Sequence, residues 1–63
     1  MTIVEFAGVA SRKPGFVGIR ELPSAVGLVV SLRHDGDAEA VLTADELDQV
    51  IAALTVARAT LEE

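Results

Sequence analysis

The amino-acid sequence predicts a small α+β domain in which four antiparallel strands are followed by one helix. Three observations favour this fold. Two early segments are rich in β-branched and aromatic residues, the middle alternates like a hairpin, and a capped apolar stripe ends the chain. The expected β-β-β-β-α meander carries its C-terminal amphipathic helix packed on one face of the sheet. The 63 residues hold no fixed-period repeat and no linker, so 1–63 is expected to be a single domain.

The N-terminal part, residues 1–25, is expected to contribute the first two strands. Residues 2–9 and 16–22 have strand composition, and Arg12-Lys13-Pro14-Gly15 between them is a turn signal. Glycines inside both segments weaken them, which leaves an alternative. In that alternative, residues 1–25 form an arm that becomes ordered only on a neighbour.

Residues 26–42 are expected to form a β-hairpin with strands 26–33 and 37–42. A three-residue loop, His34-Asp35-Gly36, with Gly36 in the left-handed region, places Arg33 opposite Asp37. This register separates polar from apolar residues, which a half-buried sheet requires. The apolar side then holds Leu28, Val30, Leu32, Ala38, Ala40 and Leu42. The other side pairs Ser31 with Glu39, beside Val29 and Val41.

A helix is expected over residues 43–62. Thr43 and Glu46 have the spacing of a capping box, in which each side chain accepts from the other residue's amide, and Leu42 and Leu47 suit a hydrophobic staple. At about 100° per residue, one stripe of this helix is apolar and is expected to face the core. The stripe consists of Leu47, Val50, Ile51, Leu54, Ala57 and Leu61.

The chain is more apolar than a domain of this size can bury. Apolar residues make up 51% of the sequence, yet a domain of about 60 residues buries only about 60% of its unfolded surface. The longest apolar stretch, residues 25–30, is far below the roughly 20 residues that span a bilayer, so no membrane partner is expected. Association with another copy or a larger assembly is therefore expected, as a homo-oligomer or a subunit of a complex.

Charge and cysteine content exclude further classes of function. The net charge is −5, with +2 on residues 1–33 and −7 on residues 34–63. This acidity argues against direct nucleic-acid binding, which needs clustered lysine and arginine. The small basic cluster of Arg12, Lys13 and Arg20 suits a solvated turn or a docking point for an acidic surface. Without cysteine, a reducing cytoplasmic location is the default expectation.

No catalytic, cofactor-binding or metal site is expected. His34 lies among Asp35, Asp37 and Glu39, but this spacing fits a solvated hairpin tip far better than a metal site. The serines lack a buried, oriented base and a walled pocket, so the protein is expected not to be an enzyme.

The candidate interface residues lie outside the expected core. On the sheet they are Val29 and Val41, and on the helix they are the small-residue strip of Ala52, Val56 and Ala59, where another backbone could approach closely. Arg58 falls within the apolar stripe of the helix. Its methylenes could cover the end of the core while the guanidinium reaches water, or it could pair with Glu5 or Glu21.

The segment Val41-Leu42-Thr43-Ala44-Asp45-Glu46, followed by Ile51-Ala52-Ala53-Leu54 and Ala57, resembles the ends of small uncharacterised hairpin-plus-helix proteins of actinobacteria and their phages. The resemblance covers about the last 38 residues and implies no shared activity. For a phage protein it implies an accessory role, in decorating an assembly or in disabling a host protein, and an association with the virion is then expected in the first case.

Two functions are therefore expected, both exerted through binding. The first is a non-enzymatic protein-protein interaction or assembly module that self-associates or binds a larger scaffold. The alternative is an acidic inhibitor or regulator that binds the basic surface of a host nucleic-acid-handling protein. Its acidic residues would be Asp35, Asp37, Glu39, Asp45, Glu46 and Asp48.

Overall fold

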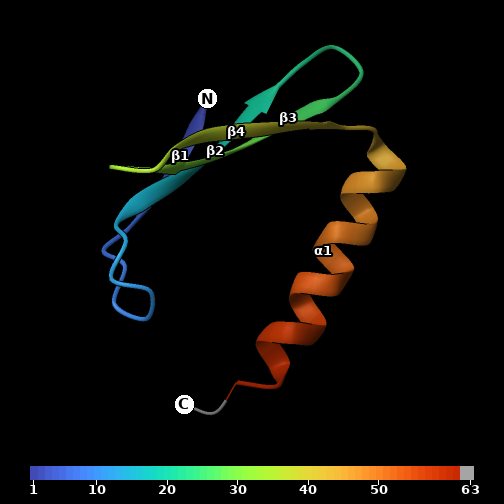
Figure 1. Ribbon diagram of the computed structural model, residues 1–63. Helices are drawn as coiled ribbons and strands as arrows, with labels where there is room; N and C mark the ends of the chain where they lie inside the picture. Colours follow the sequence, from blue (N-terminus) through green and yellow to red (C-terminus); the bar gives the residue numbers. More distant parts are fainter. Residues whose placement is uncertain (62–63) are drawn as a thin grey trace.

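The computed structural model, which describes residues 1–61, has four antiparallel strands followed by one helix (Figure 1). The strands lie side by side in sequence order, so the sheet is a meander and the predicted α+β fold class is confirmed. The elements are β1 (Thr2–Phe6), β2 (Gly15–Glu21), β3 (Val26–Leu32), β4 (Gly36–Leu42) and α1 (Ala44–Ala59).

The first strand is shorter than the sequence predicts, and residues 2–21 form a hairpin and not a detached arm. β1 ends at Phe6 because the backbone turns at Gly8, whose φ is 79°, and at Arg12, whose φ is 62°. The Arg12 amide donates to the Gly8 carbonyl at 2.5 Å. The connection to β2 is therefore a loop over residues 7–14 and not a tight turn.

The hairpin of β3 and β4 has the predicted faces but a different register. Leu32 pairs with Gly36 and Ser31 with Asp37, so the predicted pairing of Arg33 with Asp37 is wrong. The Asp35 amide donates to the Leu32 carbonyl at 3.1 Å, which closes the turn one residue earlier. Gly36 has a φ of 89°, as predicted, and begins β4. The change moves each partner by two positions, and a two-residue shift keeps every side chain on its face.

The helix begins where the capping box predicts. The Glu46 amide donates to Thr43 Oγ1 at 3.3 Å, and the Thr43 amide donates to Glu46 Oε1 at 3.0 Å. Thr43 is thus the N-cap, and Asp45 and Glu46 place negative charge in the first turn, where the helix dipole favours it. The helix ends at Ala59, and the predicted end at residue 62 lies outside the described residues.

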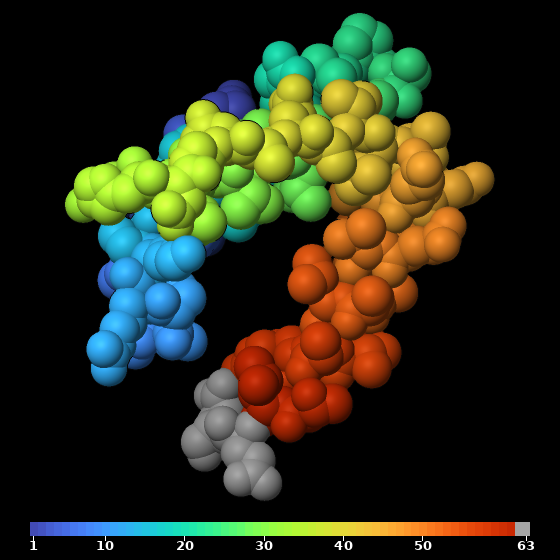
Figure 2. Space-filling model, in the orientation of Figure 1, coloured from blue at the N-terminus to red at the C-terminus, as the bar shows by residue number. Residues whose placement is uncertain are grey.

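The helix does not pack across the sheet, which corrects the prediction that it covers one face. It leaves the end of β4 and runs away from the strands, so that its contacts with the sheet are mainly with β4 (Figure 1). Figure 2 shows open space between the sheet, the loop of residues 7–14 and the helix. Only Thr43 separates β4 from α1, and one residue is shorter than the 2–6 that usually join a strand to a helix packed on its sheet.

The consequence is that the described chain has no buried core. Within residues 1–61 no hydrophobic side chain is buried, and Gly18 and Gly27 are the residues with the least exposed surface. In the same range, no helix has the length and apolar character required to cross a membrane.

Candidate interaction surfaces

One face of the sheet is almost wholly apolar. Residues that pair across two strands lie on the same face, and so does every second residue along each strand. Across the sheet, Val4 pairs with Val17, Val17 with Val30, and Val30 with Ala38, and the rows on either side of this one mix polar and apolar residues. We call this side the apolar sheet face. It consists of Val4, Phe6, Val17, Ile19, Val26, Leu28, Val30, Leu32, Ala38, Ala40 and Leu42.

The apolar sheet face is open. Neighbouring side chains half-bury Val17, Ile19 and Leu28, while Val30 near its centre remains 42% exposed. Thr2 and Glu21 occupy the corresponding positions at its margin. Nothing charged stands in the middle of this face, so a partner surface could cover it without desolvating an ion.

The apolar stripe of the helix is open too. Leu47 and Val50, in the first two turns, are half-buried, but beyond them the stripe is exposed to the end of the helix. Leu54 is 63% exposed, and Ile51 and Leu61 are exposed to a similar degree. The residues that the sequence predicts as core are therefore exposed or half-buried.

The opposite side of the sheet, which we call the mixed face, is held together by polar contacts. Arg20 Nη2 donates to Glu39 Oε1 at 2.7 Å, and Ser31 Oγ donates to Asp37 Oδ1 at 2.5 Å. Gly27 lies between Arg20 and Glu39, and a Cβ at that position would stand 2.6 Å from Glu39 Oε2. Because Gly27 has no side chain, the ion pair of Arg20 and Glu39 fits above this position without a steric clash.

The predicted interface residues are divided between two separate surfaces. Val29 and Val41 lie on the mixed face, where Val29 is half-buried and Val41 is 56% exposed. The small-residue strip of Ala52, Val56 and Ala59 is exposed on α1. Arg58 is in the last turn of the helix, where a cation complements the helix dipole.

Two of the three residues in the basic cluster of Arg12, Lys13 and Arg20 form ion pairs within the chain. Lys13 Nζ lies 3.1 Å from Asp35 Oδ2, which ties the β1–β2 loop to the β3–β4 turn. Arg20 is held by Glu39 on the mixed face. Of the three cationic residues, Arg12 alone has no ion pair within residues 1–61.

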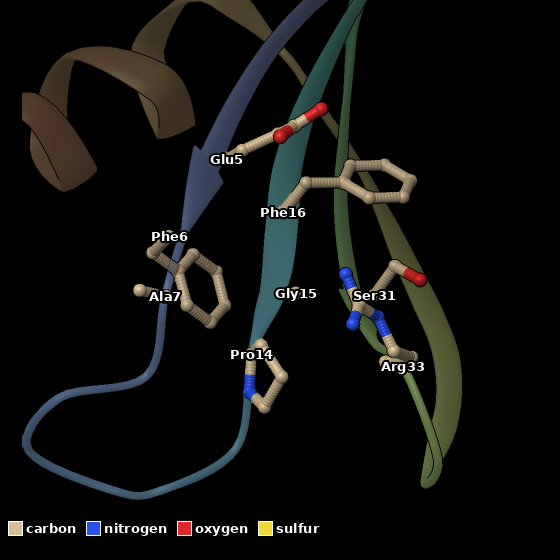
Figure 3. A pocket seen from close by; sticks show the side chains of 8 residues that line it. All are labelled: Glu5, Phe6, Ala7, Pro14, Gly15, Phe16, Ser31 and Arg33. Carbon is tan, nitrogen blue, oxygen red and sulfur yellow. The ribbon is translucent and has the colours of Figure 1, made fainter.

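An open hollow of about 410 Å³ lies at the end of the mixed face near this loop. Figure 3 shows the ring of Phe16 between the carboxylate of Glu5 and the side chains of Ser31 and Arg33. Phe6, Ala7, Pro14 and Gly15 complete its wall. Two aromatic rings, one cation and one anion thus line the hollow.

The acidic side chains near His34 in the sequence do not converge on it among the described residues. His34 and Asp35 lie in the β3–β4 turn, Asp35 is paired with Lys13, and Asp37 accepts from Ser31. Within residues 1–61, no three His, Asp or Glu side chains are placed to share a metal ion.

Comparisons of the chain with family models, with curated proteins and with solved structures give no match.

The apolar pattern of the sequence predicts the residues of the apolar sheet face and of the helix stripe, but it predicts them as a buried core. The signal that reveals them as an outer surface is the length of the connection at Thr43, since the apolar pattern is the same whether the two surfaces meet within one chain or between two.

Proposed function

We propose that this protein is a non-enzymatic protein-protein interaction or assembly module, whose apolar surfaces are covered by another copy or by a larger scaffold. The observation that supports it is the absence of any buried hydrophobic side chain within residues 1–61, beside ten large exposed ones. Burial of apolar surface is the dominant favourable contribution to folding. A chain that buries so little alone gains this contribution through association.

The resemblance of residues 41–57 to small proteins of actinobacteria and their phages suggests a setting for this module. Within the proposal, the chain is an accessory or decoration-type structural protein, which binds repeatedly to an assembly and is found with the virion. Its working partner is then protein, with no direct contact to nucleic acid or membrane.

Light scattering and thermal unfolding over a hundredfold range of chain concentration test this proposal. We expect a mass above 6.6 kDa and an unfolding midpoint that rises with concentration, because association stabilises only the folded chain. Val30→Glu, which places a charge on the apolar sheet face, is expected to abolish both effects. The matched control Ile3→Glu, at an exposed position of the mixed face, is expected to retain them. A folded monomer whose midpoint is independent of concentration would contradict the proposal.

The second candidate is the acidic inhibitor of a host nucleic-acid-handling protein, favoured by the concentration of acids on β4 and the start of α1. It has less support, because Asp35, Asp37, Glu39 and Glu46 already make contacts within the chain. Asp45 and Asp48 remain for a partner. The two candidates respond differently to salt, since screening weakens a complex of opposite charges and does not weaken apolar association.

A further inference from the structure

Every copy of this chain carries two apolar surfaces that do not cover each other. One is the apolar sheet face and the other is the helix stripe, which is exposed from Ile51 onward. If the proposed function holds, a partner covers both the apolar sheet face and the helix stripe, and the structure indicates which partner this is. Three observations bear on it: the connection at Thr43, the dimensions of the two surfaces, and the surface area of the chain.

The connection keeps the helix away from its own sheet. β4 ends at Leu42 and α1 begins at Ala44, so Thr43 is the whole connection. Thr43 is also fixed in an extended conformation, with a φ of −70° and a ψ of 169°, by the two hydrogen bonds of the capping box. A helix that folds back over its sheet usually needs 2–6 connecting residues. Short connections of this kind favour exchange of an element between copies.

The two surfaces match in size. The 16 residues of α1 make a helix about 24 Å long, and the seven-residue strands β2, β3 and β4 are about 23 Å long. Each copy offers one helix and one sheet face, so two copies related by a twofold axis satisfy both surfaces of both chains. A different protein would have to supply separate apolar surfaces for the helix stripe and for the sheet face.

The exposed area supports a partner of this size. The chain exposes 5145 Å², whereas a folded monomer of 6.6 kDa exposes about 3,900 Å². The difference of about 1,200 Å² per chain, or about 2,500 Å² for two, falls in the range of obligate homodimer interfaces, which begins at about 2,000 Å².

We propose that the covering partner is a second copy of this chain, and that α1 of each copy packs its apolar stripe across the apolar sheet face of the other. Leu54, in the middle of the stripe, then lies over Val30, in the middle of the sheet face. The small-residue strip of Ala52, Val56 and Ala59 faces outward.

Disulfide crosslinking tests this geometry directly, because the native chain has no cysteine. Single variants Val30→Cys and Leu54→Cys, the second carrying a mass tag, are unfolded together in urea, refolded together and oxidised. We expect a bond between position 30 of one chain and position 54 of the other. The matched pair Val41→Cys and Leu54→Cys is expected to give at least tenfold less bond, because Val41 lies on the mixed face.

Each result has a distinct meaning. Bonds of 30 to 30 or 54 to 54 without the mixed bond would overturn helix exchange and leave the assembly proposal standing, since the copies would then meet sheet to sheet or helix to helix. A chain that light scattering shows as a folded monomer would overturn both.

Lengthening the connection provides a second test that leaves every side chain intact. Gly-Ser-Gly-Ser inserted between Leu42 and Thr43 should let α1 fold onto its own sheet and raise the dimer dissociation constant by at least about tenfold, because an attached helix competes at about millimolar effective concentration. The same insertion between Ser11 and Arg12, in the β1–β2 loop, is the control and should leave the dimer unchanged. An equal dissociation constant for both variants would overturn helix exchange.

Discussion

At the scale of single residues, Gly27 lets charged side chains from two strands that are not neighbours meet. Arg20 on β2 and Glu39 on β4 stand on either side of β3, and their ion pair crosses β3 at Gly27, the one position of that strand without a side chain. An added Cβ at Gly27 would lie 2.6 Å from Glu39 Oε2 and 3.4 Å from Arg20 Nε. The sheet thereby gains a contact between its second and fourth strands besides the backbone ladder.

A double-mutant cycle of Arg20→Ala and Glu39→Ala measures this contact. We expect a coupling free energy of about 0.5–1 kcal/mol, at the upper end for an exposed pair because Glu39 is about one-third exposed, and a smaller one in 1 M salt. The measurement is urea unfolding at one fixed chain concentration. Lys13 and Asp35, which are more exposed, form the control pair and should couple more weakly. Equal coupling in the two cycles would show that the crossing at Gly27 adds nothing.

Gly36 allows a clean measurement of backbone strain. Its φ is 89°, and no atom lies within 4 Å of where a Cβ would stand, so Gly36→Ala changes backbone preference without a steric clash. We expect a loss of about 1–2 kcal/mol in the free energy of unfolding, since L side chains disfavour this region. Gly36→Asn should lose less, because asparagine tolerates positive φ. An equal loss in both variants would point to a cause other than backbone conformation.

At the scale of elements, the helix start at Thr43 can be tested with a control in the same helix. Thr43→Ala removes the hydroxyl that accepts from the Glu46 amide and should cost about 1 kcal/mol. Thr55→Ala removes a hydroxyl that donates to the Ile51 carbonyl at an exposed mid-helix position. Since alanine has the higher helix propensity, this second change should cost nothing. Urea unfolding followed by helical circular dichroism provides the measurement, and a loss only at Thr55 would contradict the assigned cap.

The elements themselves could be predicted because each depends on local chemistry. The capping box at Thr43 and the positive φ at Gly36 follow from neighbours three residues away or fewer. The register of β3 and β4 could not, because the correct pairing and the predicted one place the same side chains on the same faces. β1 ends early because of the backbone turn at Gly8, which the sequence indicates as a weak point of the strand but not as its end.

The placement of the helix, and with it the candidate surface, is what sequence patterning missed. A periodic apolar stripe indicates that the helix buries one side, but periodicity contains no information about which sheet it meets. The predicted interface residues Val29, Val41 and Val56 are those that lie outside the expected core. That core is absent from residues 1–61, and the role of these three residues in an interface stays a prediction.

At the scale of the whole molecule, the chain is larger than its length requires. Its radius of gyration is 13.0 Å, against about 10.6 Å for a folded domain of 63 residues, and its extents are 34 × 29 × 16 Å. A thin sheet and a helix that extends away from it account for this expansion (Figure 1).

Truncation of Leu54 to alanine tests whether the apolar stripe of the helix is covered in solution. Leu54 is 63% exposed and Val56 is 66% exposed in the single chain, so both truncations to alanine should be nearly neutral if the chain acts alone. With the helix stripe covered, we expect Leu54→Ala to cost at least about 2 kcal/mol and Val56→Ala to stay near zero. Urea unfolding at fixed chain concentration measures both. The opposite ranking would place the interface on the strip of Ala52, Val56 and Ala59.

The meander has a kinetic consequence. All of its strand pairs join neighbours in sequence, and such local hairpins form within about 1–10 μs. The finished sheet fully buries no hydrophobic side chain within residues 1–61, so under the proposed helix exchange the step that completes the native state is an encounter between molecules. Refolding after dilution from urea should then be second order, with a half-time that doubles each time the chain is diluted twofold, and freshly made chains should stay sensitive to proteases until they meet.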